Sequence, residues 1–266
     1  MYAFELSKPS SLSEAVSMLS DEGAQALGGG QTLLPTMKAR LAQADTLIAL
    51  SGIAEMRFVR AEGGVLSIGG GTPHGVVAAE AAAYPALASL AGRIGDPAVR
   101  SRGTVGGSLA NNDPSACYPA GALASGATIV AQGPGGAREI AADDFFQGLF
   151  TTALDEGEIV TEVRFPIPEA AAYEKMRQPA SRFPLVAVFV AKFADGVRVA
   201  VTGASNDGVF RWIEAETALG ADFSPAALDA LPLPDAGDMI SDLHGTGEYR
   251  AHLCKVMARR AVASAA

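Results

Sequence analysis

The most informative part of this chain is a pair of glycine-rich stretches, Gly28-Gly29-Gly30-Gln31-Thr32-Leu33-Leu34-Pro35 and Arg102-Gly103-Thr104-Val105-Gly106-Gly107-Ser108-Leu109. Glycine has no Cβ, so the backbone of each stretch can lie very close to another group. Both stretches also carry a small hydroxyl residue, and main-chain N–H groups in such loops can close on a phosphate. Together they predict a site for a phosphate-containing ligand.

The spacing within the first stretch separates it from the common nucleotide-binding loops. It lacks the Gly-x-Gly-x-x-Gly spacing of a Rossmann site and the Gly-Lys-Ser/Thr of a P-loop, so both are disfavoured. A helix that starts near Leu33 points its free N–H groups and the positive end of its dipole back into the loop, which suits an anion. The alternative, that three glycines form only a tight turn between a strand and a helix, stays open on spacing alone.

The second stretch and its flanks favour binding over a plain turn. Glycines at three positions surround two hydroxyl residues, so backbone amides and hydroxyls can converge on one acceptor-rich ligand. Arg100 and Arg102 can add charge-assisted contacts, and Asn111-Asn112-Asp113 offer polar groups for ribose or ribityl hydroxyls. An exposed, arginine-flanked loop followed by the turn signature Asn-Asn-Asp-Pro is the competing interpretation.

The N-terminal segment predicts a βαβ-like unit around the first stretch. Ser11 or Ser13 can cap an amphipathic helix. Ala24–Leu27 is expected to be a strand that leads into the glycines, Leu33–Leu41 a helix, and Leu47–Leu50 a buried strand. This order of strand, loop, helix and strand is that of a βαβ-like opening.

The middle of the chain predicts hairpins around an alanine-rich helical region. Two pairs of runs form hairpins across turns that contain glycine: Met56–Arg60 with Val65–Ile68, and Ala127–Ala131 with Arg138–Ile140. A third run of glycines, Gly69-Gly70-Gly71, follows the first hairpin. A helix from about Val76 to Ile94 is expected to bend or break at Pro85. Ile159–Phe165 is expected to be a strand that ends at a proline.

A linker followed by a small α+β domain is expected in the last third. Pro166–Ala172 is the best candidate for the linker. Leu185–Phe193 and Val197–Ala204 predict a hairpin across Asp195-Gly196. Three later segments are expected to be helical: Ile213–Leu219, Ser224–Ala230 and Gly247–Val262.

Composition and charge exclude several functions. The chain has 266 residues and a net charge of −9, and it lacks the clustered basic residues that nucleic acid requires. Cys117 and Cys254 are too few for an iron–sulfur cluster or a structural zinc site. Two thiols in a reducing cytoplasm are expected, with a disulfide between them as the alternative. No signal peptide or membrane span is legible, so a cytoplasmic location is expected.

The sequence shows no recognisable set of catalytic or metal-binding residues either. The three histidines, His74, His244 and His252, show no ligand spacing and are expected to be surface or capping groups. No Ser–His–Asp set or pair of carboxylates stands out. We therefore expect neither catalytic residues nor metal ligands in this chain, which suits a protein whose cofactor carries the chemistry.

Together with their flanks, the two stretches resemble the FAD-binding medium subunits of the molybdenum hydroxylases, the family of the carbon monoxide dehydrogenase medium chain and the FAD-binding xanthine dehydrogenase proteins. The first signature covers Gly28–Pro35 and Met37-Lys38, and the second runs from Ile94-Gly95-Asp96 through Val99–Leu109. Weaker similarities extend the match over nearly the whole chain. They are Asp144-Phe145-Phe146 with Gly148, Thr151–Leu154, Gly157-Glu158, Tyr173-Glu174-Lys175 and Glu248–Leu253.

The resemblance implies an α+β fold in two domains. A two-lobed FAD-binding domain of the PCMH/vanillyl-alcohol-oxidase type would span residues 1–166, with lobes of about 1–52 and 53–166. A small α+β C-terminal domain, similar to that of the carbon monoxide dehydrogenase flavoproteins, would span residues 173–266. FAD would lie between the lobes and the C-terminal domain.

The resemblance also implies which residues hold FAD. Both loops would cradle its pyrophosphate, and the residues just after the second loop would approach its ribityl and flavin portions. The implied cofactor-binding residues are Gly29, Gly30, Gln31, Thr32, Leu33, Thr104, Gly106, Gly107, Ser108, Asn112, Asp113, Cys117, Ile159 and Lys175.

Three of these assignments carry a qualification. Cys117 stands where the family usually has an aspartate, and a thiol is a poorer hydrogen-bond acceptor than a carboxylate. Lys175 aligns with a lysine that contacts the cofactor in xanthine dehydrogenases, and an exposed lysine at a strand end is the alternative. Core packing is the alternative for Ile159.

By this resemblance the chain is the FAD-binding electron-transfer subunit of a heteromeric molybdenum hydroxylase, an oxidoreductase. It would pass electrons from an iron–sulfur subunit through FAD to an external acceptor. Its partners would be a large molybdopterin subunit and a small iron–sulfur subunit in a dimer of heterotrimers, and only these would carry the molybdopterin and the clusters. The alternatives are a self-sufficient flavin-dependent oxidoreductase and a non-catalytic assembly protein that retains the fold.

Overall fold

The N-terminal segment forms a small parallel sheet of three strands. In chain order, one helix precedes the second strand and another helix follows it. The computed structural model describes residues 1–265. Its first sheet has the order β1 (Glu5–Ser7), β3 (Thr46–Ala49), β2 (Ala24–Leu27), and both pairings are parallel. Two helices connect these strands: α1 (Leu12–Leu19) and α2 (Leu33–Lys38). The predicted βαβ order is confirmed, and β1 is a strand that the sequence analysis did not identify.

Helix α1 shows why the N-terminal sequence folds as predicted. Ser11 is its N-cap, with extended backbone and a side chain that accepts from the Glu14 N–H. Ala15, Val16 and Leu19 are its buried residues, and they pack in a cluster with Ile48 of β3. The helix thus covers one side of the small sheet with a single apolar face.

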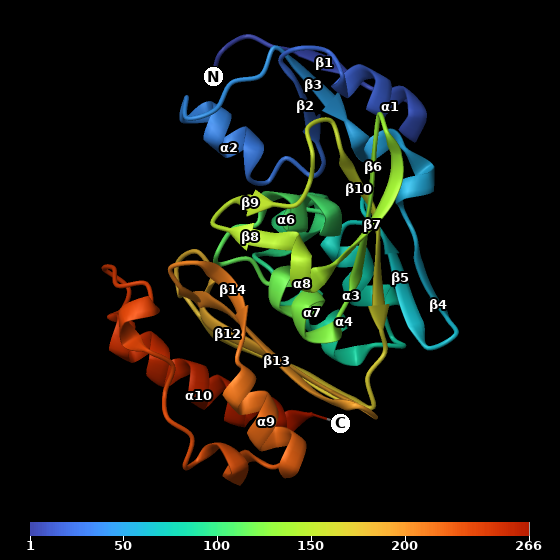
Figure 1. Ribbon diagram of the computed structural model, residues 1–266. Helices are drawn as coiled ribbons and strands as arrows, with labels where there is room; N and C mark the ends of the chain where they lie inside the picture. Colours follow the sequence, from blue (N-terminus) through green and yellow to red (C-terminus); the bar gives the residue numbers. More distant parts are fainter. Residues whose placement is uncertain (266) are drawn as a thin grey trace.

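The second sheet is antiparallel and is built from the two expected hairpins. Its order is β4 (Val59–Glu62), β5 (Val65–Gly69), β10 (Ile159–Pro166), β6 (Thr128–Gly133), β7 (Gly136–Ala141). Strand β10 pairs with β5 on one side and with β6 on the other, so a strand distant in sequence joins the two hairpins. Figure 1 shows this sheet on the right of the molecule at mid-height, below the N-terminal sheet, with β4 at the outer edge.

Helices fill the space between the second and third sheets. The expected break at Pro85 in the helical region of residues 76–94 is confirmed, because α3 ends at Glu80 and Pro85 is the first residue of α4. The helices and the short hairpin of this region are α3 (His74–Glu80), α4 (Pro85–Gly92), α5 (Pro97–Arg102), α6 (Val105–Asn111), α7 (Tyr118–Ser125), α8 (Ala142–Phe145), β8 (Phe146–Gly148) and β9 (Thr151–Thr152).

The third sheet lies between helices on both faces. Its order is β11 (Ala170–Arg177), β12 (Pro184–Phe193), β13 (Gly196–Ser205), β14 (Gly208–Arg211), and all pairings are antiparallel. Helices α9 (Ile213–Ala221) and α10 (Gly247–Ser264) contact one face, and α7 contacts the other (Figure 1). Because β12 is covered on both faces, residues 184–191 are all buried, which explains its continuous apolar run.

Two predicted segments of the last third differ from the structure. The proposed linker Pro166–Ala172 is shorter than expected, because β11 already begins at Ala170 and pairs with Lys192 of β12. Its alanine-rich start lacks the β-branched residues that announce a strand. The predicted helix over residues 224–230 is a single 3-10 turn, Pro225–Leu228. The division into domains at residues 166 and 173 stays a prediction.

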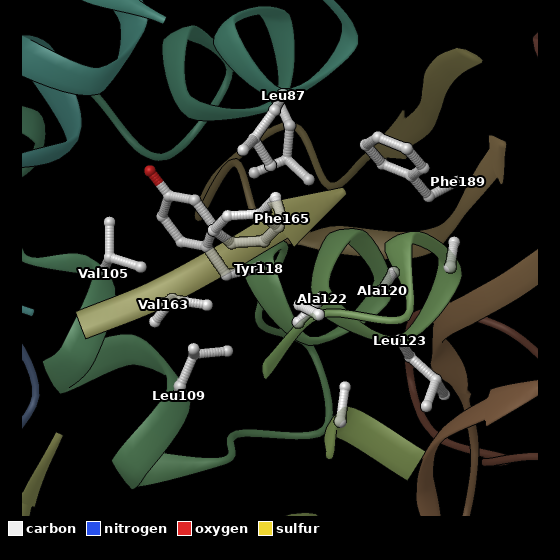
Figure 2. Packing of buried hydrophobic residues seen from close by; sticks show 14 of the residues in the cluster. Leu87, Val105, Leu109, Tyr118, Ala120, Ala122, Leu123, Val163, Phe165 and Phe189 are labelled. Carbon is white, nitrogen blue, oxygen red and sulfur yellow. The ribbon is translucent and has the colours of Figure 1, made fainter. Parts of the chain in front are cut away.

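One hydrophobic core joins the second and third sheets through α7. Figure 2 shows Leu87 of α4, Tyr118 of α7, Phe165 of β10 and Phe189 of β12 converging in it. Every residue of α7 is buried, and most are small. A helix surrounded by protein has no polar face, so its sequence shows no amphipathic period. This is why α7 could not be recognised from the sequence.

Candidate cofactor-binding site

The two glycine-rich stretches lie against each other. A Cβ on Gly29 would overlap the carbonyl of Arg102 and would lie 2.6 Å from the Cα of Gly103. A Cβ on Gly28 would lie 3.1 Å from the Thr104 hydroxyl oxygen. This close approach of two backbones is possible only without a side chain at Gly29. The two stretches are therefore parts of one structure, as the sequence analysis predicted.

The first stretch opens α2 with free backbone donors. The N–H groups of Gln31, Thr32 and Leu33 donate to no other residue in the described part of the chain, whereas the Leu34 N–H donates to the Gly30 carbonyl at 3.3 Å. Gly30 has a φ of +70°, in the left-handed region that favours glycine. Free N–H groups at the positive end of a helix are suited to an anion.

The second stretch uses its own N–H groups within the protein, which corrects the expectation that they converge on a ligand. Thr104 is the N-cap of α6, and its Oγ1 accepts from the Gly107 N–H at 3.2 Å. The N–H groups of Val105 and Gly106 donate to carbonyls within residues 69–73. In this conformation the three amides are not available to a ligand. The second stretch can still offer a ligand its hydroxyl groups and a backbone without side chains at the glycines.

The third run of glycines, Gly69-Gly70-Gly71, is hydrogen-bonded to the backbone of the second stretch. The Gly70 carbonyl accepts from the Gly106 N–H at 2.9 Å, and the Gly70 N–H donates to the Thr161 carbonyl at 2.7 Å. A Cβ on Gly106 would lie 3.0 Å from the Val160 carbonyl oxygen. No function could be assigned to this run from the sequence, and its three consecutive glycines after a strand were the available signal.

A cavity of about 800 Å³ lies where these loops meet the C-terminal segment. Its size is in the upper part of the range of about 300–1,000 Å³ that is common for small-molecule and cofactor sites. All the predicted site residues except Asn112 line it. These are Gly29, Gly30, Gln31, Thr32, Leu33, Thr104, Gly106, Gly107, Ser108, Asp113, Cys117, Ile159 and Lys175. The structure therefore brings together residues from three distant parts of the sequence.

Asn112 has a different place. It is buried beside the cavity, and its side-chain amide donates to the carbonyls of Gly148 at 2.7 Å and Thr151 at 2.8 Å. Its own carbonyl accepts from the Phe150 N–H at 3.1 Å. Asn112 therefore fixes the β8–β9 hairpin, and its neighbours Asn111 and Asp113 face the cavity.

The cavity carries more basic than acidic side chains. Its basic lining residues are Arg57, Arg102, Lys175 and Arg182, and its acidic ones are Asp113 and Glu158. Glu158 is already paired with Arg138 at 2.7 Å, and this hydrogen bond lowers the pKa of the carboxyl. Burial raises the pKa of Asp113. In a chain of net charge −9, this local excess of positive charge favours an anionic ligand.

Lys175 is buried, so the alternative of an exposed strand-end lysine is wrong. Only 8% of its surface is exposed, and its Nζ donates to the Arg93 carbonyl at 3.0 Å and to the Cys117 sulfur at 3.4 Å. Burial is the main cause that lowers the pKa of Lys175. Arg93 in turn donates to the Tyr173 carbonyl at 2.6 Å, which ties α4 to β11. These contacts hold the lysine at the wall of the cavity.

The loop that carries Asp113 and Cys117 is anchored from the C-terminal segment. Thr202 of β13 donates its hydroxyl to the carbonyls of Pro114 at 3.0 Å and Ala116 at 2.8 Å. The Gly203 N–H also donates to the Pro114 carbonyl, at 2.8 Å. The third sheet therefore positions one wall of the cavity.

His74 is buried, which corrects the expectation that all three histidines are surface or capping groups. It is the first residue of α3, it is 5% exposed, and its ring lies 5.3 Å from that of Tyr118. Its Nδ1 has no hydrogen-bond partner among the described residues. Burial, with a smaller effect of Arg100, lowers the pKa of His74 to about 4.

The buried His74 predicts a loss of stability in mild acid. The unfolded chain binds a proton near pH 6.5 and the folded chain only near pH 4, so the free energy of unfolding falls as the pH decreases between these values. This amounts to about 3 kcal/mol between pH 7 and pH 4. We expect His74→Gln to lack this part of the pH dependence in urea unfolding. Parallel pH profiles of the variant and the wild type would contradict the assignment.

Three further findings concern metals, membranes and the two cysteines. Among the described residues, no group of three His, Cys, Asp or Glu side chains is arranged to hold a metal ion. None of the helices in residues 1–265 is long and apolar enough to cross a bilayer. Both cysteines are free and buried, so the alternative of a disulfide between them is wrong.

Comparisons with known proteins agree with this geometry. The family described as the FAD-binding domain in molybdopterin dehydrogenase matches residues 2–168. The carbon monoxide dehydrogenase medium chain of Afipia carboxidovorans is 34% identical over 98% of this chain and 96% of its own length. The nicotine 6-hydroxylase medium subunit of Paenarthrobacter nicotinovorans is 33% identical over 99% of this chain and 97% of its own length.

Solved structures give the same result. Reconstituted CO dehydrogenase from Oligotropha carboxidovorans contains a chain that superposes with a TM-score of 0.88, at 32% identity, over 98% of this chain and 97% of that one. Quinoline 2-oxidoreductase from Pseudomonas putida 86 contains a chain that superposes with a TM-score of 0.88, at 27% identity, over 98% of this chain and 96% of that one. The expected α+β fold is therefore confirmed over nearly the whole chain.

Proposed function

This chain belongs to the family of FAD-binding domains in molybdopterin dehydrogenases, and we propose that it is the FAD-binding electron-transfer subunit of a molybdenum hydroxylase. Its similarity to medium chains such as those of carbon monoxide dehydrogenase and nicotine 6-hydroxylase spans both their lengths and its own. It takes electrons from an iron–sulfur subunit and passes them through FAD to an external acceptor.

The observation that carries this proposal is the contact between the two glycine-rich stretches at the cavity. The backbone of Gly29 touches the second stretch where a Cβ would overlap it, and free N–H groups of residues 31–33 open the adjacent helix. This arrangement and the local excess of basic side chains fit the pyrophosphate of FAD, which carries two negative charges. The residues present therefore fit the cofactor that the family binds.

We assign the FAD contacts to the predicted residues that line the cavity. Gln31, Thr32 and Leu33 would donate backbone N–H groups to the pyrophosphate, and the hydroxyl of Ser108 would add a donor from the second stretch. Asn112 would act on the cofactor site indirectly, because its side-chain amide holds the β8–β9 hairpin in place. When bound, FAD supplies the redox chemistry of the subunit.

Lys175 and the walls of the cavity control the environment of that chemistry. An ammonium group held at the wall by Arg93 and Cys117 favours negative charge inside the cavity. Buried Ile159 and Val160 line the cavity with apolar surface, which limits the access of water. The chain thus binds, orients and shields the cofactor, and we assign no catalytic acid or base to it.

Family membership also indicates the partners of this chain. The relatives are named as the medium chain or the medium subunit of their enzymes, which implies a larger and a smaller partner. We propose that this chain joins a large molybdopterin subunit and a small iron–sulfur subunit in a dimer of heterotrimers, and that residues 1–166 and 173–266 are its two domains. Its two reduced thiols support a cytoplasmic location. The substrate of the complex is set by the molybdenum subunit.

A visible spectrum of the purified chain tests the proposal. After incubation with FAD and removal of free cofactor, we expect one equivalent of bound flavin per chain. Addition of the dithionite-reduced iron–sulfur subunit, freed of excess dithionite, is expected to bleach the flavin absorbance. A chain that retains no flavin contradicts the proposal. A chain whose flavin is reduced directly by an organic substrate, with no partner present, favours a self-sufficient oxidoreductase instead.

A further inference from the structure

A second, smaller cavity of about 260 Å³ lies beside the cofactor cavity. Half of its ten lining residues also line the cofactor cavity, so the two cavities share one wall. This shared wall consists of Asp113, Ser115, Ser181, Phe183 and Pro184. The small cavity has room for several water molecules, each of which takes about 30 Å³ in the liquid. The proposed function makes no use of this space.

The outer wall of the small cavity reaches the surface of the protein. Asp242 and His244 line it, and both residues are exposed. Gln178 fixes the imidazole in place, because its Nε2 donates to the His244 Nδ1 at 2.7 Å. The Gln178 Oε1 accepts from the Ala180 N–H at 2.9 Å, which sets the orientation of this amide. The small cavity therefore connects surface water with the shared wall.

Asp113 is the residue of the shared wall that can carry a proton. The other four members are two serines, a phenylalanine and a proline, none of which is an acid or a base near neutral pH. The Asp113 Oδ1 accepts from the Ser115 N–H at 2.8 Å, which fixes the side chain. Its Oδ2 accepts from no residue of the described chain, yet it is not sealed in the protein interior. This second oxygen is therefore able to bind a proton from water.

The charged groups around Asp113 have other partners or are exposed. On the side of the small cavity, Asp242 accepts from Arg250 at 2.8 and 2.9 Å, and the imidazole of the outer wall is the remaining titratable group. On the cofactor side, Lys175 contacts the thiol beside it at 3.4 Å, and Arg182 is exposed. Burial raises the pKa of Asp113, while its backbone hydrogen bond acts in the opposite direction. The carboxyl group thus takes up a proton more readily than an exposed aspartate does.

The proposed electron transfer needs a proton that its donor does not supply. An iron–sulfur cluster delivers electrons one at a time and carries no proton, whereas the two-electron reduction of a flavin takes up one proton. The apolar side chains of Ile159 and Val160 limit the access of water to the cofactor cavity. A group in the wall of that cavity must therefore pass the proton, and the proposed function leaves this group unassigned.

We propose that Asp113 carries protons between the water of the small cavity and the cofactor cavity, an inference that rests on the proposed function. The carboxylate takes a proton at Oδ2 from water on one side of the shared wall and releases it on the other side. Only the O–H bond of the carboxyl group forms and breaks, and Asp113 is neither oxidised nor reduced. One proton enters for every two electrons that the iron–sulfur subunit delivers, and one leaves when the acceptor takes these electrons.

Infrared titration of the full, FAD-free chain tests the carboxyl group itself. Subtracting the spectrum of Asp113→Asn from that of the wild type isolates the carboxyl band of Asp113. We expect the midpoint of this band to lie above the ordinary range of aspartate, because the side chain is partly buried. A midpoint within or below that range would contradict the proposal, since Asp113 would then hold a proton no better than an exposed aspartate.

Stopped-flow mixing of the FAD-loaded chain with the dithionite-reduced iron–sulfur subunit tests the transfer. Asp113→Asn is expected to slow the appearance of fully reduced flavin about 100-fold, and Asp113→Glu to retain most of the rate. Formate is a carboxylic acid small enough for the small cavity, and we expect it to accelerate Asp113→Ala about tenfold. Ser181→Ala is the matched control, because it changes the shared wall without removing an acid, and it should react like the wild type.

Wild-type speed in Asp113→Asn would overturn the proposal. A slow Asp113→Ala that formate does not accelerate, together with a slow Asp113→Glu, would also overturn it, because the carboxylate would then have a structural role. Loss of bound FAD from Asp113→Asn but not from Asp113→Glu would show that the carboxylate holds the cofactor instead. A wild-type chain that retains no flavin contradicts the proposed function, whereas the infrared titration needs no flavin, so the two failures are distinguishable.

Discussion

Gly29→Ala is expected to remove bound FAD from this protein. The new Cβ would overlap the Arg102 carbonyl and lie 2.6 Å from the Gly103 Cα, and backbone atoms cannot swing away as a flexible side chain can. The two stretches must therefore separate, and the free N–H groups of the first must leave their position beside the second. We expect the affinity for FAD to fall at least 100-fold, which corresponds to about 3 kcal/mol.

Titration of the FAD-free chain with FAD, followed by flavin fluorescence, measures this effect. Gly135→Ala is the matched control, because a Cβ at Gly135 meets nothing within 4 Å in the β6–β7 turn. The control is expected to bind FAD like the wild type. The overlap also costs folding free energy, about 1–3 kcal/mol for overpacking, so the urea midpoint of Gly29→Ala should fall while the chain stays folded in the absence of urea. Wild-type FAD affinity in Gly29→Ala would show that the loop contact does not form the cofactor site.

The parts of the site that the sequence could predict are those encoded in single short stretches. The glycine content alone predicts a close approach of the backbone at Gly28–Pro35 and at Arg102–Leu109. The structure places these two stretches in contact. Hairpins are similarly local, because a glycine turn between two apolar runs specifies them. The fold class and the position of the cavity therefore followed from a few segments and the family they resemble.

The parts that could not be predicted depend on residues far apart in the sequence. Lys175 is buried because Arg93 and Cys117 meet it from two other elements, and no local pattern distinguishes it from an exposed lysine. His74 is buried by packing on Tyr118 and the backbone of Gly103. Asn112 looked like a ligand because it follows the second stretch, but its left-handed backbone turns its amide toward the β8–β9 hairpin. In each case tertiary contacts decide the role.

Arg250→Met is expected to destabilise the C-terminal part of the chain by about 3–5 kcal/mol. The Arg250 side chain is almost fully buried, and its Nη1 donates to the carbonyls of Leu185 and Gly203, both at 2.7 Å. Its Nη2 donates to both carboxylate oxygens of Asp242, at 2.8 and 2.9 Å. Methionine fills a similar volume but leaves two buried carbonyls and the carboxylate without their donor.

The same residue connects helix α10 to the cofactor cavity. Gly203 accepts from Arg250 through its carbonyl and donates its N–H to the Pro114 carbonyl at 2.8 Å, and Pro114 lies between Asp113 and Ser115 of the cavity wall. Gly203 has a φ of +81°, so its backbone depends on these two hydrogen bonds to stay in place. We therefore expect Arg250→Met also to weaken FAD binding, although Arg250 is not among the residues that line that cavity.

Urea unfolding at pH 7 and FAD titration of the same samples measure the two effects together. Arg259→Met on the same helix is the matched control, because Arg259 forms an exposed ion pair with Asp229, and such pairs contribute at most about 1 kcal/mol. Arg250→Lys keeps the charge and one donor direction, so its loss of stability should be smaller than that of Arg250→Met. If Arg250→Met and Arg259→Met cost the same, the buried guanidinium does not hold the third sheet against α10. If stability falls but FAD affinity does not, Gly203 and Pro114 keep the cavity wall in place without Arg250.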